Sequence, residues 1–264
     1  MKKFAKLAVA GLVAALSFAA QADLLIDDFN TRDQLISDNT TLGGGVWDST
    51  NAGGASTGIL GGYRDIYAEK LSDPSSNGFT GVTMGVYAGR LNFSTATGDN
   101  ATGIVRWDGS NTNAAINATG LGSVNFAADA TAFKIKVYNS DLGFPFAIEV
   151  YTDADHWSRL IVASVAVSLG SPDTNPIQFV DFLGGAGLNN VLLGSGAFLS
   201  TGSLGSVNFA SVGALQAIIN LNGATQSVDL SIDAVNAIPE PASLALVGAA
   251  LLGLGAVRRR KASK

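Results

Sequence analysis

The chain of 264 residues contains no cysteine, and it contains a single histidine. Without cysteine it can form no disulfide, no zinc–thiolate site and no cysteine nucleophile. A Ser-His-Asp triad would have to use His156, and no G-x-S-x-G motif surrounds any serine. We interpret the segment Asp153-Ala-Asp155-His156-Trp157 as a turn between strands that end at Tyr151 and start at Arg159.

Glutamate is also scarce, since residues 23–238 contain only Glu69 and Glu149. Glycosidases use two facing carboxyl groups, and glutamate usually supplies at least one of them. Glu149 alternates within an apolar strand and is expected to face solvent. No spacing singles out a pair of aspartates either. We therefore expect a protein that is not an enzyme and has no catalytic residues.

The N-terminal segment has the pattern of a secretory signal peptide. Three lysines precede the apolar run from Leu7 to Phe18, and small residues follow at Ala20 and Ala22. Signal peptidase requires small residues at these positions, so we expect cleavage after Ala22. Residues 1–22 are therefore left out of the fold prediction.

The C-terminal segment has three parts in a fixed order. Pro239-Glu240-Pro241 comes first, an uncharged run from Ala242 to Val257 follows, and a basic cluster closes it: Arg258, Arg259, Arg260 and Lys261. As a helix the run would be about 24 Å long, close to the thickness of a bilayer core. The basic cluster, within the tail 258–264, is expected to stay in the cytoplasm, which places the Pro-Glu-Pro tripeptide on the other side of the membrane. By physical chemistry alone this segment is either a processing site or a plain tail anchor with a proline-bearing stalk.

This order of tripeptide, glycine-containing apolar helix and arginine cluster resembles the PEP-CTERM sorting signal, here within residues 236–264. The resemblance implies that an exosortase, an integral membrane protease-transferase, processes the chain at Pro239, Glu240 and Pro241. It also implies a Gram-negative bacterium, an inner-membrane precursor, and a final location at the cell surface or in the exopolysaccharide matrix. The partners expected on this route are signal peptidase, the exosortase and, transiently, the membrane.

The segment between the two signals is strongly acidic. Removing both ends leaves 16 − 8 = 8 basic and 21 − 1 = 20 acidic residues in 23–238, a net charge of −12. This charge repels phosphate backbones, so nucleic acid is not expected as a partner. It also disfavours an anionic polysaccharide unless Ca²⁺ bridges the two.

Short strands separated by glycine-rich turns recur along residues 23–235 and predict an all-β, jelly-roll-like β-sandwich. In the clearest strand, Phe133 to Tyr138, alternation places Lys134 and Lys136 on the wet face. The expected strands lie at 24–26, 81–87, 103–107, 133–138, 146–151, 159–169, 177–182, 215–221 and 227–232. The heptapeptide LGSVNFA occurs at 121–127 and again at 204–210, either by chance or as equivalent strand entries in two halves of a sandwich.

Three further motifs resemble galactose-binding-like β-sandwiches, the fold of many carbohydrate-binding modules. They are the opening Ile26-Asp27-Asp28-Phe29, the element Gly61-Gly62-Tyr63-Arg64-Asp65, and the closing Leu230-Ser-Ile232-Asp233-Ala-Val235. This resemblance implies a sandwich whose first and last strands pair, and it implies a sugar-binding role.

Trp107, Trp157 and Trp47 stand beside carboxylates or turns, where an indole could stack on a sugar ring. The alternative is that they belong to the core. Asp27, Asp28 and Asp233 are weak candidates for a Ca²⁺ site at the paired terminal strands, and no other cofactor is expected. Three functions therefore stay open: a carbohydrate-binding or adhesive module, a structural matrix component and, least favoured, a glycan-acting enzyme.

Overall fold

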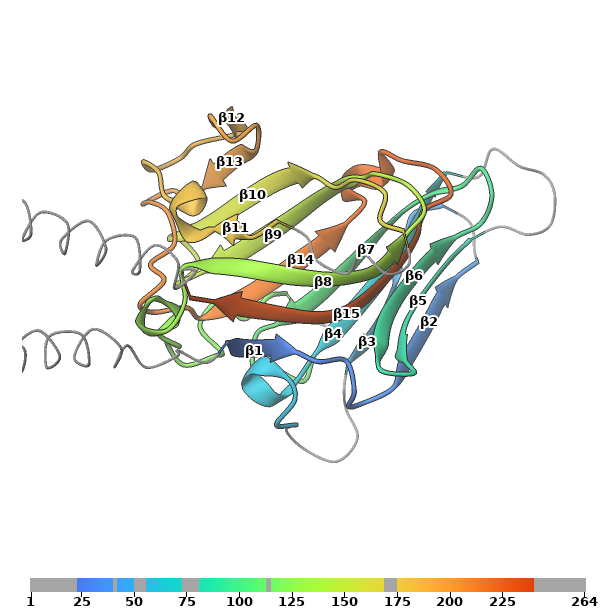
Figure 1. Cartoon of the computed structure of the whole chain (residues 1–264), viewed down its shortest axis with the longest axis horizontal. Coiled ribbons are helices and arrows are strands. Elements are labelled where there is room, and N and C mark those ends of the chain that lie inside the picture. Colours follow the sequence, from blue (N-terminus) through green and yellow to red (C-terminus); the bar gives the residue numbers. More distant parts are fainter. Residues whose placement is uncertain are drawn as a thin grey trace, which may run out of the picture. The chain divides into compact units, whose positions relative to one another are not determined.

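The computed structural model describes residues 23–39, 42–49, 56–72, 81–112, 115–168 and 175–239. Within them, fifteen strands form two antiparallel sheets, an all-β arrangement consistent with the expected sandwich (Figure 1). None of the helices in these residues has the length and apolar character needed to cross a bilayer. The predicted signal peptide, the apolar run 242–257 and the basic cluster lie outside the described residues.

The first sheet has seven strands. Its order is β11 (Ile177–Gln178), β8 (Ala132–Ser140), β15 (Asp229–Ile238), β6 (Arg90–Thr95), β5 (Val82–Tyr87) and β2 (Gln34–Asp38), with β1 (Leu24–Asp27) also paired to β15. The first and last strands therefore pair, as expected for the terminal strands, and Leu24 lies opposite Ala237.

The second sheet has eight strands. Its order is β12 (Val191–Leu192), β13 (Phe198–Thr201), β10 (Trp157–Ala163), β9 (Pro145–Tyr151), β14 (Ala214–Ile219), β7 (Asn100–Trp107), β4 (Asp65–Ser72) and β3 (Val46–Ser49). Four short 3₁₀ helices connect the strands: η1 (Leu60–Gly62), η2 (Phe126–Ala128), η3 (Phe179–Phe182) and η4 (Leu221–Gly223). The finer jelly-roll topology stays a prediction.

The core lies between the inner faces of the two sheets and follows from strand alternation. In β8, Phe133, Ile135 and Val137 are buried, whereas Lys134 and Lys136 are partly or fully exposed, as predicted. The same alternation in β9 and β10 sends every second side chain into the core. The other side chains form the outer face of the eight-stranded sheet.

Three predicted strands end earlier than expected. The strand expected at 159–169 ends at Ala163, the last residue of β10. The run Ile177 to Phe182 pairs with β8 over only two residues and then turns into η3, where Phe179 and Phe182 are buried. The run that starts at Leu215 leaves β14 after Ile219, because Asn220 adopts the left-handed conformation at φ 51°. Apolar residues can fill a core from a 3₁₀ turn as well as from a strand, so apolar runs alone do not fix these ends.

The two LGSVNFA copies lie against each other, and each precedes a strand of a different sheet, β8 after the first copy and β14 after the second. The backbone N–H groups of Phe126 and Ala127 in the first copy donate to the carbonyl of Phe209 in the second, at 2.8 and 3.1 Å. Both phenylalanines are buried, and the Phe209 ring stacks on Phe179 with centroids 3.9 Å apart. The repeat therefore closes the core at one end of the domain.

Candidate functional site

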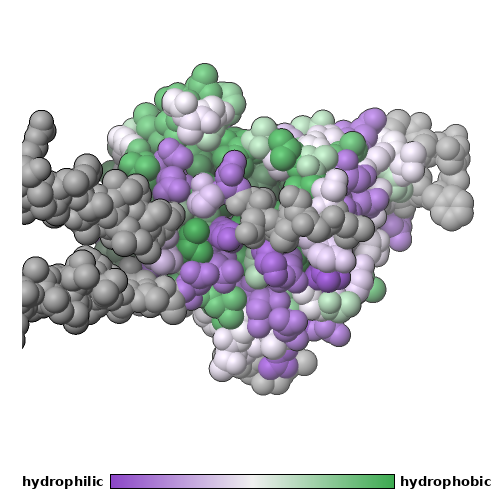
Figure 2. Space-filling view, in the orientation of Figure 1, coloured by the Kyte–Doolittle hydropathy of each residue, from purple (hydrophilic) through white to green (hydrophobic). Residues whose placement is uncertain are grey.

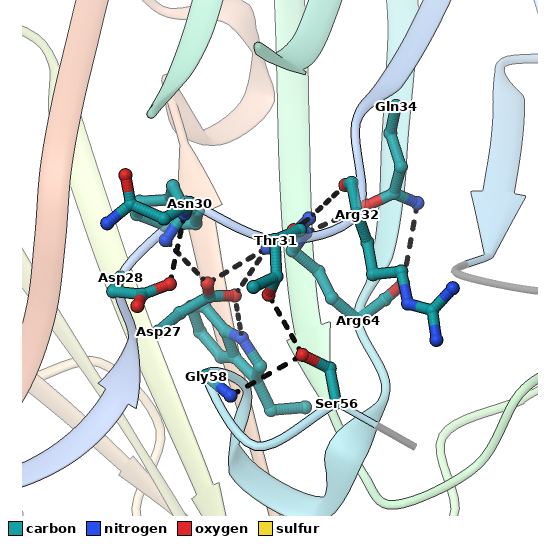
Figure 3. Close-up of polar contacts among 11 residues, drawn as sticks. Asp27, Asp28, Asn30, Thr31, Arg32, Gln34, Ser56, Gly58 and Arg64 are labelled. Carbon is teal, nitrogen blue, oxygen red and sulfur yellow. Dashed lines mark hydrogen bonds and ion pairs between the residues drawn. The ribbon is translucent and has the colours of Figure 1, made fainter. Parts of the chain in front are cut away.

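A buried ion pair joins two of the motifs that suggested the fold (Figure 3). Arg64 Nη1 donates to both carboxylate oxygens of Asp27 at 2.9 Å, and both side chains are fully buried. Its Nη2 donates to the carbonyls of Thr31 and Arg32 in the turn that follows β1. Arg32 and Phe29 both adopt positive φ, so Arg64 stabilises a strained turn. We assign this cluster a structural role.

Trp107 belongs to the same cluster, and the prediction that it stacks on a sugar is wrong. Its side chain is 1% exposed and its Nε1 donates to Asp27 Oδ2 at 2.8 Å. It lies at the end of β7 at a position that alternation directs into the core. The neighbouring Asp108 accepts from the backbone N–H groups of Ser110 and Asn117, so this carboxylate orders a turn.

The structure does not bring the three candidate Ca²⁺ ligands together. Asp27 is occupied by Arg64, Trp107 and the N–H of Phe29. Asp28 accepts from the N–H of Asn30 (Figure 3), and Asp233 forms an ion pair with Lys136. Within the described residues there is no group of three or more His, Asp or Glu side chains that could hold a metal ion. The expectation of a shared calcium site at these residues is therefore corrected.

A row of polar side chains crosses the outer face of the eight-stranded sheet. Strand register places these residues side by side on seven neighbouring strands, one residue for each strand, and we call them the polar row: Ser200, Arg159, Glu149, Gln216, Arg106, Asp65 and Ser49. The charged members alternate in sign along the row. It therefore offers both hydrogen-bond donors and acceptors without a net charge.

Glu149, the third member of this row, accepts three side-chain hydrogen bonds. Its carboxylate accepts from Tyr151 Oη at 2.7 Å, Gln216 Nε2 at 3.0 Å and Arg159 Nη1 at 3.4 Å. The side chain points away from the core, as strand alternation predicts, but it is only 7% exposed. The expectation that it faces solvent is wrong, because long neighbouring side chains cover it. Strand alternation determines on which face of the sheet a side chain lies, but it does not determine whether neighbouring side chains cover it.

The polar row also contains several buried polar atoms, among them Ser49 Oγ, both carboxylate oxygens of Asp65, and Arg159 Nε. A hydrogen bond from Ser49 to the Asp65 carboxylate lowers the pKa of Asp65 against the larger effect of burial. Buried polar groups cost stability unless they are hydrogen-bonded.

Aromatic rings lie beside the row at two places. On β3 and β4, Trp47 packs against Tyr67 with ring centroids 4.6 Å apart, and the Arg106 guanidinium lies 4.5 Å from the Trp47 ring. On β10 and β9, Trp157 lies 6.1 Å from Tyr151, centroid to centroid. All four rings are partly exposed. Their role in binding stays a prediction, and their position makes it possible.

Burial raises the pKa of Asp65 to about 6, and the side chain is 1% exposed. The unfolded pKa is about 3.9, so the unfolded chain loses its proton first as the pH rises. Domain stability should therefore fall between about pH 4 and 6 by roughly 2–3 kcal/mol and stay constant above that range. Asp65→Asn should remove this loss and stabilise the domain at pH 7. Urea unfolding at about pH 4 and at pH 7 measures the effect, with Asp33→Asn as the exposed control. An equal change in the free energy of unfolding between these pH values in the wild type and in Asp65→Asn would contradict the prediction.

His156 lies in a tight turn between β9 and β10, as predicted. Its carbonyl accepts from the N–H of Thr152, and its ring Nδ1 lies 3.0 Å from both oxygens of Asp153. No serine oxygen is among the hydrogen-bond partners of this ring in the described part of the chain. The turn Asp153–Trp157 is thus a connection between strands.

Comparison with known proteins identifies the C-terminal segment. The PEP-CTERM protein-sorting motif matches residues 237–261. None of the curated proteins compared with the chain matches it. The motif indicates an exported protein of a Gram-negative bacterium, made as a membrane-anchored precursor and processed by an exosortase. Of the tripeptide, only Pro239 lies within the described residues, one residue after the end of β15.

Proposed function

We propose that the domain 23–238 is a non-enzymatic module that binds a neutral polysaccharide through the polar row and its flanking aromatic rings, at the cell surface or in the extracellular matrix. The observation that carries the proposal is the two pairs of partly exposed aromatic rings beside the polar row, Trp47 with Tyr67 and Trp157 with Tyr151. Sugar hydroxyls can both donate and accept, so they suit a row of alternating charges.

Charge supports a neutral ligand rather than an anionic one. The net charge of −12 over residues 23–238 (8 basic, 20 acidic) repels polyanions, and the described residues contain no acidic cluster that would hold a bridging calcium ion. Stacking on an indole and hydrogen bonding to the row require neither a counter-ion nor a metal.

The spacing of carboxyl groups supports binding rather than cleavage. Glu149 and Asp65 share the row but stand three strands apart, which is about 14 Å at the usual strand spacing. Glycosidase carboxyls lie about 5–9.5 Å apart. A structural matrix component without a ligand is the second candidate, favoured by the fact that the row atoms are covered by their neighbours.

Trp157→Ala and Trp47→Ala should each weaken retention by a neutral glycan about five- to a hundredfold, because one stacked ring contributes on the order of 1–3 kcal/mol. Both variants should unfold close to the wild-type urea midpoint. The measurement is affinity electrophoresis of residues 23–238 in gels containing neutral glucans or galactans, with Ca²⁺ and with chelator.

Tyr87→Ala is the matched control, because Tyr87 is an exposed aromatic residue on β5 of the other sheet. It should leave retention unchanged. Wild-type protein that migrates freely in every gel, or tryptophan variants that simply unfold, would leave the structural role as the better account.

A further inference from the structure

An exposed apolar patch covers the end of the domain from which the C-terminal segment emerges. Its residues are large, apolar and at least 42% exposed, and we call them the apolar patch: Val180, Leu183, Val191, Leu192, Phe198 and Leu204. The hydrophobic surface over β12 and β13 is visible in Figure 2. Single exposed apolar side chains are common, but six large ones gathered on η3, β12, β13 and the segments beside them indicate a contact surface.

Hydrogen bonds connect this patch to the last residue of β15. The carbonyl of Ile238 accepts from the N–H of Thr131, and the carbonyl of Thr131 accepts from the N–H of Phe179, each at 2.8 Å. Val180 follows directly in η3. The segment after η3 then lies along β13, where Thr201 Oγ1 donates to the carbonyl of Gly185. The patch and the exit of the chain therefore lie at the same end (Figure 1).

The sequence sets how far this end can stand from a bilayer. Three residues, Pro239 to Pro241, separate Ile238 from the apolar run that begins at Ala242. Fully extended, they reach about 10–12 Å. If the run spans the membrane, as the sequence predicts, the end that carries the patch is held within side-chain reach of the lipid headgroups.

We propose that, in the membrane-anchored precursor, the apolar patch docks into the interfacial layer of the bilayer to which the chain is tethered. The large apolar side chains enter the boundary between headgroups and acyl chains, where burial of their surface is favourable. Tethering raises the effective concentration of lipid, so a small patch suffices. Docking would hold the Pro-Glu-Pro tripeptide at the membrane surface, and processing would release the patch. This inference does not depend on glycan binding.

The absence of cysteine makes the test direct, because a single introduced cysteine carries one fluorescent label. We would label Leu183→Cys and Leu192→Cys in the patch, and Leu35→Cys as the control. Leu35 is 66% exposed on β2, at the opposite end of the domain (Figure 1). The full chain is reconstituted in phosphatidylcholine vesicles that contain a lipid spin-labelled at its headgroup, and flotation confirms that it is anchored.

Labels at 183 and 192 should be quenched by the spin-labelled lipid at least about threefold more than the label at 35. Adding Val180→Asp and Leu183→Asp to the Leu192→Cys chain should reduce its quenching to the control level, with an unchanged urea midpoint. Equal quenching at all three positions would overturn the proposal. So would a chain that does not float, or unlabelled patch cysteines that form disulfides between two copies while the labelled ones remain unquenched.

Discussion

Replacing Arg64 by alanine should destabilise the domain by about 3–5 kcal/mol, the largest effect we expect from a single substitution. Arg64 is the only cation that hydrogen-bonds to Asp27 among the described residues, and both side chains are fully buried. Burial raises the pKa of Asp27, while the charge of Arg64 and the hydrogen bond from Trp107 lower it. Without Arg64 the carboxyl group loses its counter-charge, and the carbonyls of Thr31 and Arg32 lose a donor.

Urea unfolding of residues 23–238 measures this effect. Arg90→Ala is the control, because Arg90 is partly exposed and lies 3.6 Å over the ring of Tyr138. It should change the free energy of unfolding by less than about 1 kcal/mol. The double variant Asp27→Leu/Arg64→Met should lose less than the sum of its single changes, since both charges leave together. A loss below 1 kcal/mol for Arg64→Ala would show that the pair does not fix the turn after β1.

Replacing Pro239, Glu240 and Pro241 together by alanine should abolish processing and leave the full-length precursor in the membrane. From the sequence we expect the prolines to keep the tripeptide extended and accessible, since proline lacks a backbone N–H and restricts the residue before it. Three alanines remove this constraint and the carboxylate. The apolar run and the basic cluster remain, so the chain should still be anchored.

Immunoblots of membrane and released fractions measure the outcome. Ser243→Ala is the matched control, because it changes the apolar run and leaves the tripeptide intact. It should be processed like the wild-type chain. Normal processing of the triple-alanine chain would show that the tripeptide is not the recognition element.

The sequence predicts the two faces of a strand well because alternation is local, but the expected strands leave out β2, β3, β4, β6, β12 and β13. The inward and outward faces of β8 follow directly from the spacing of Phe133, Lys134, Ile135 and Lys136. Pairing of β1 with β15 is also indicated, since the ends of the domain carry similar short apolar runs followed by aspartate. The C-terminal motif is specific because three physically distinct parts occur in one order.

The candidate site is harder to predict because it depends on register between strands that are distant in sequence. Asp65, Arg106 and Glu149 share one row only through the pairing of β4, β7, β14 and β9. Nothing local distinguishes the buried Trp107 from the partly exposed Trp157, since both stand beside a turn. The partner of Asp27 could be found only from the fold, as Arg64 lies 37 positions further along the chain.

The central claim is that the chain is an exported protein processed at its PEP-CTERM signal, and the intact mass of the mature wild-type protein tests it most directly. The protein would be collected from the surface and medium of the producing cells and measured without digestion. We predict an N-terminus at Asp23 and a C-terminus at or beside Pro239–Pro241, with the apolar run and the basic cluster removed. A mass that still includes Ala242 to Lys264 would contradict the account.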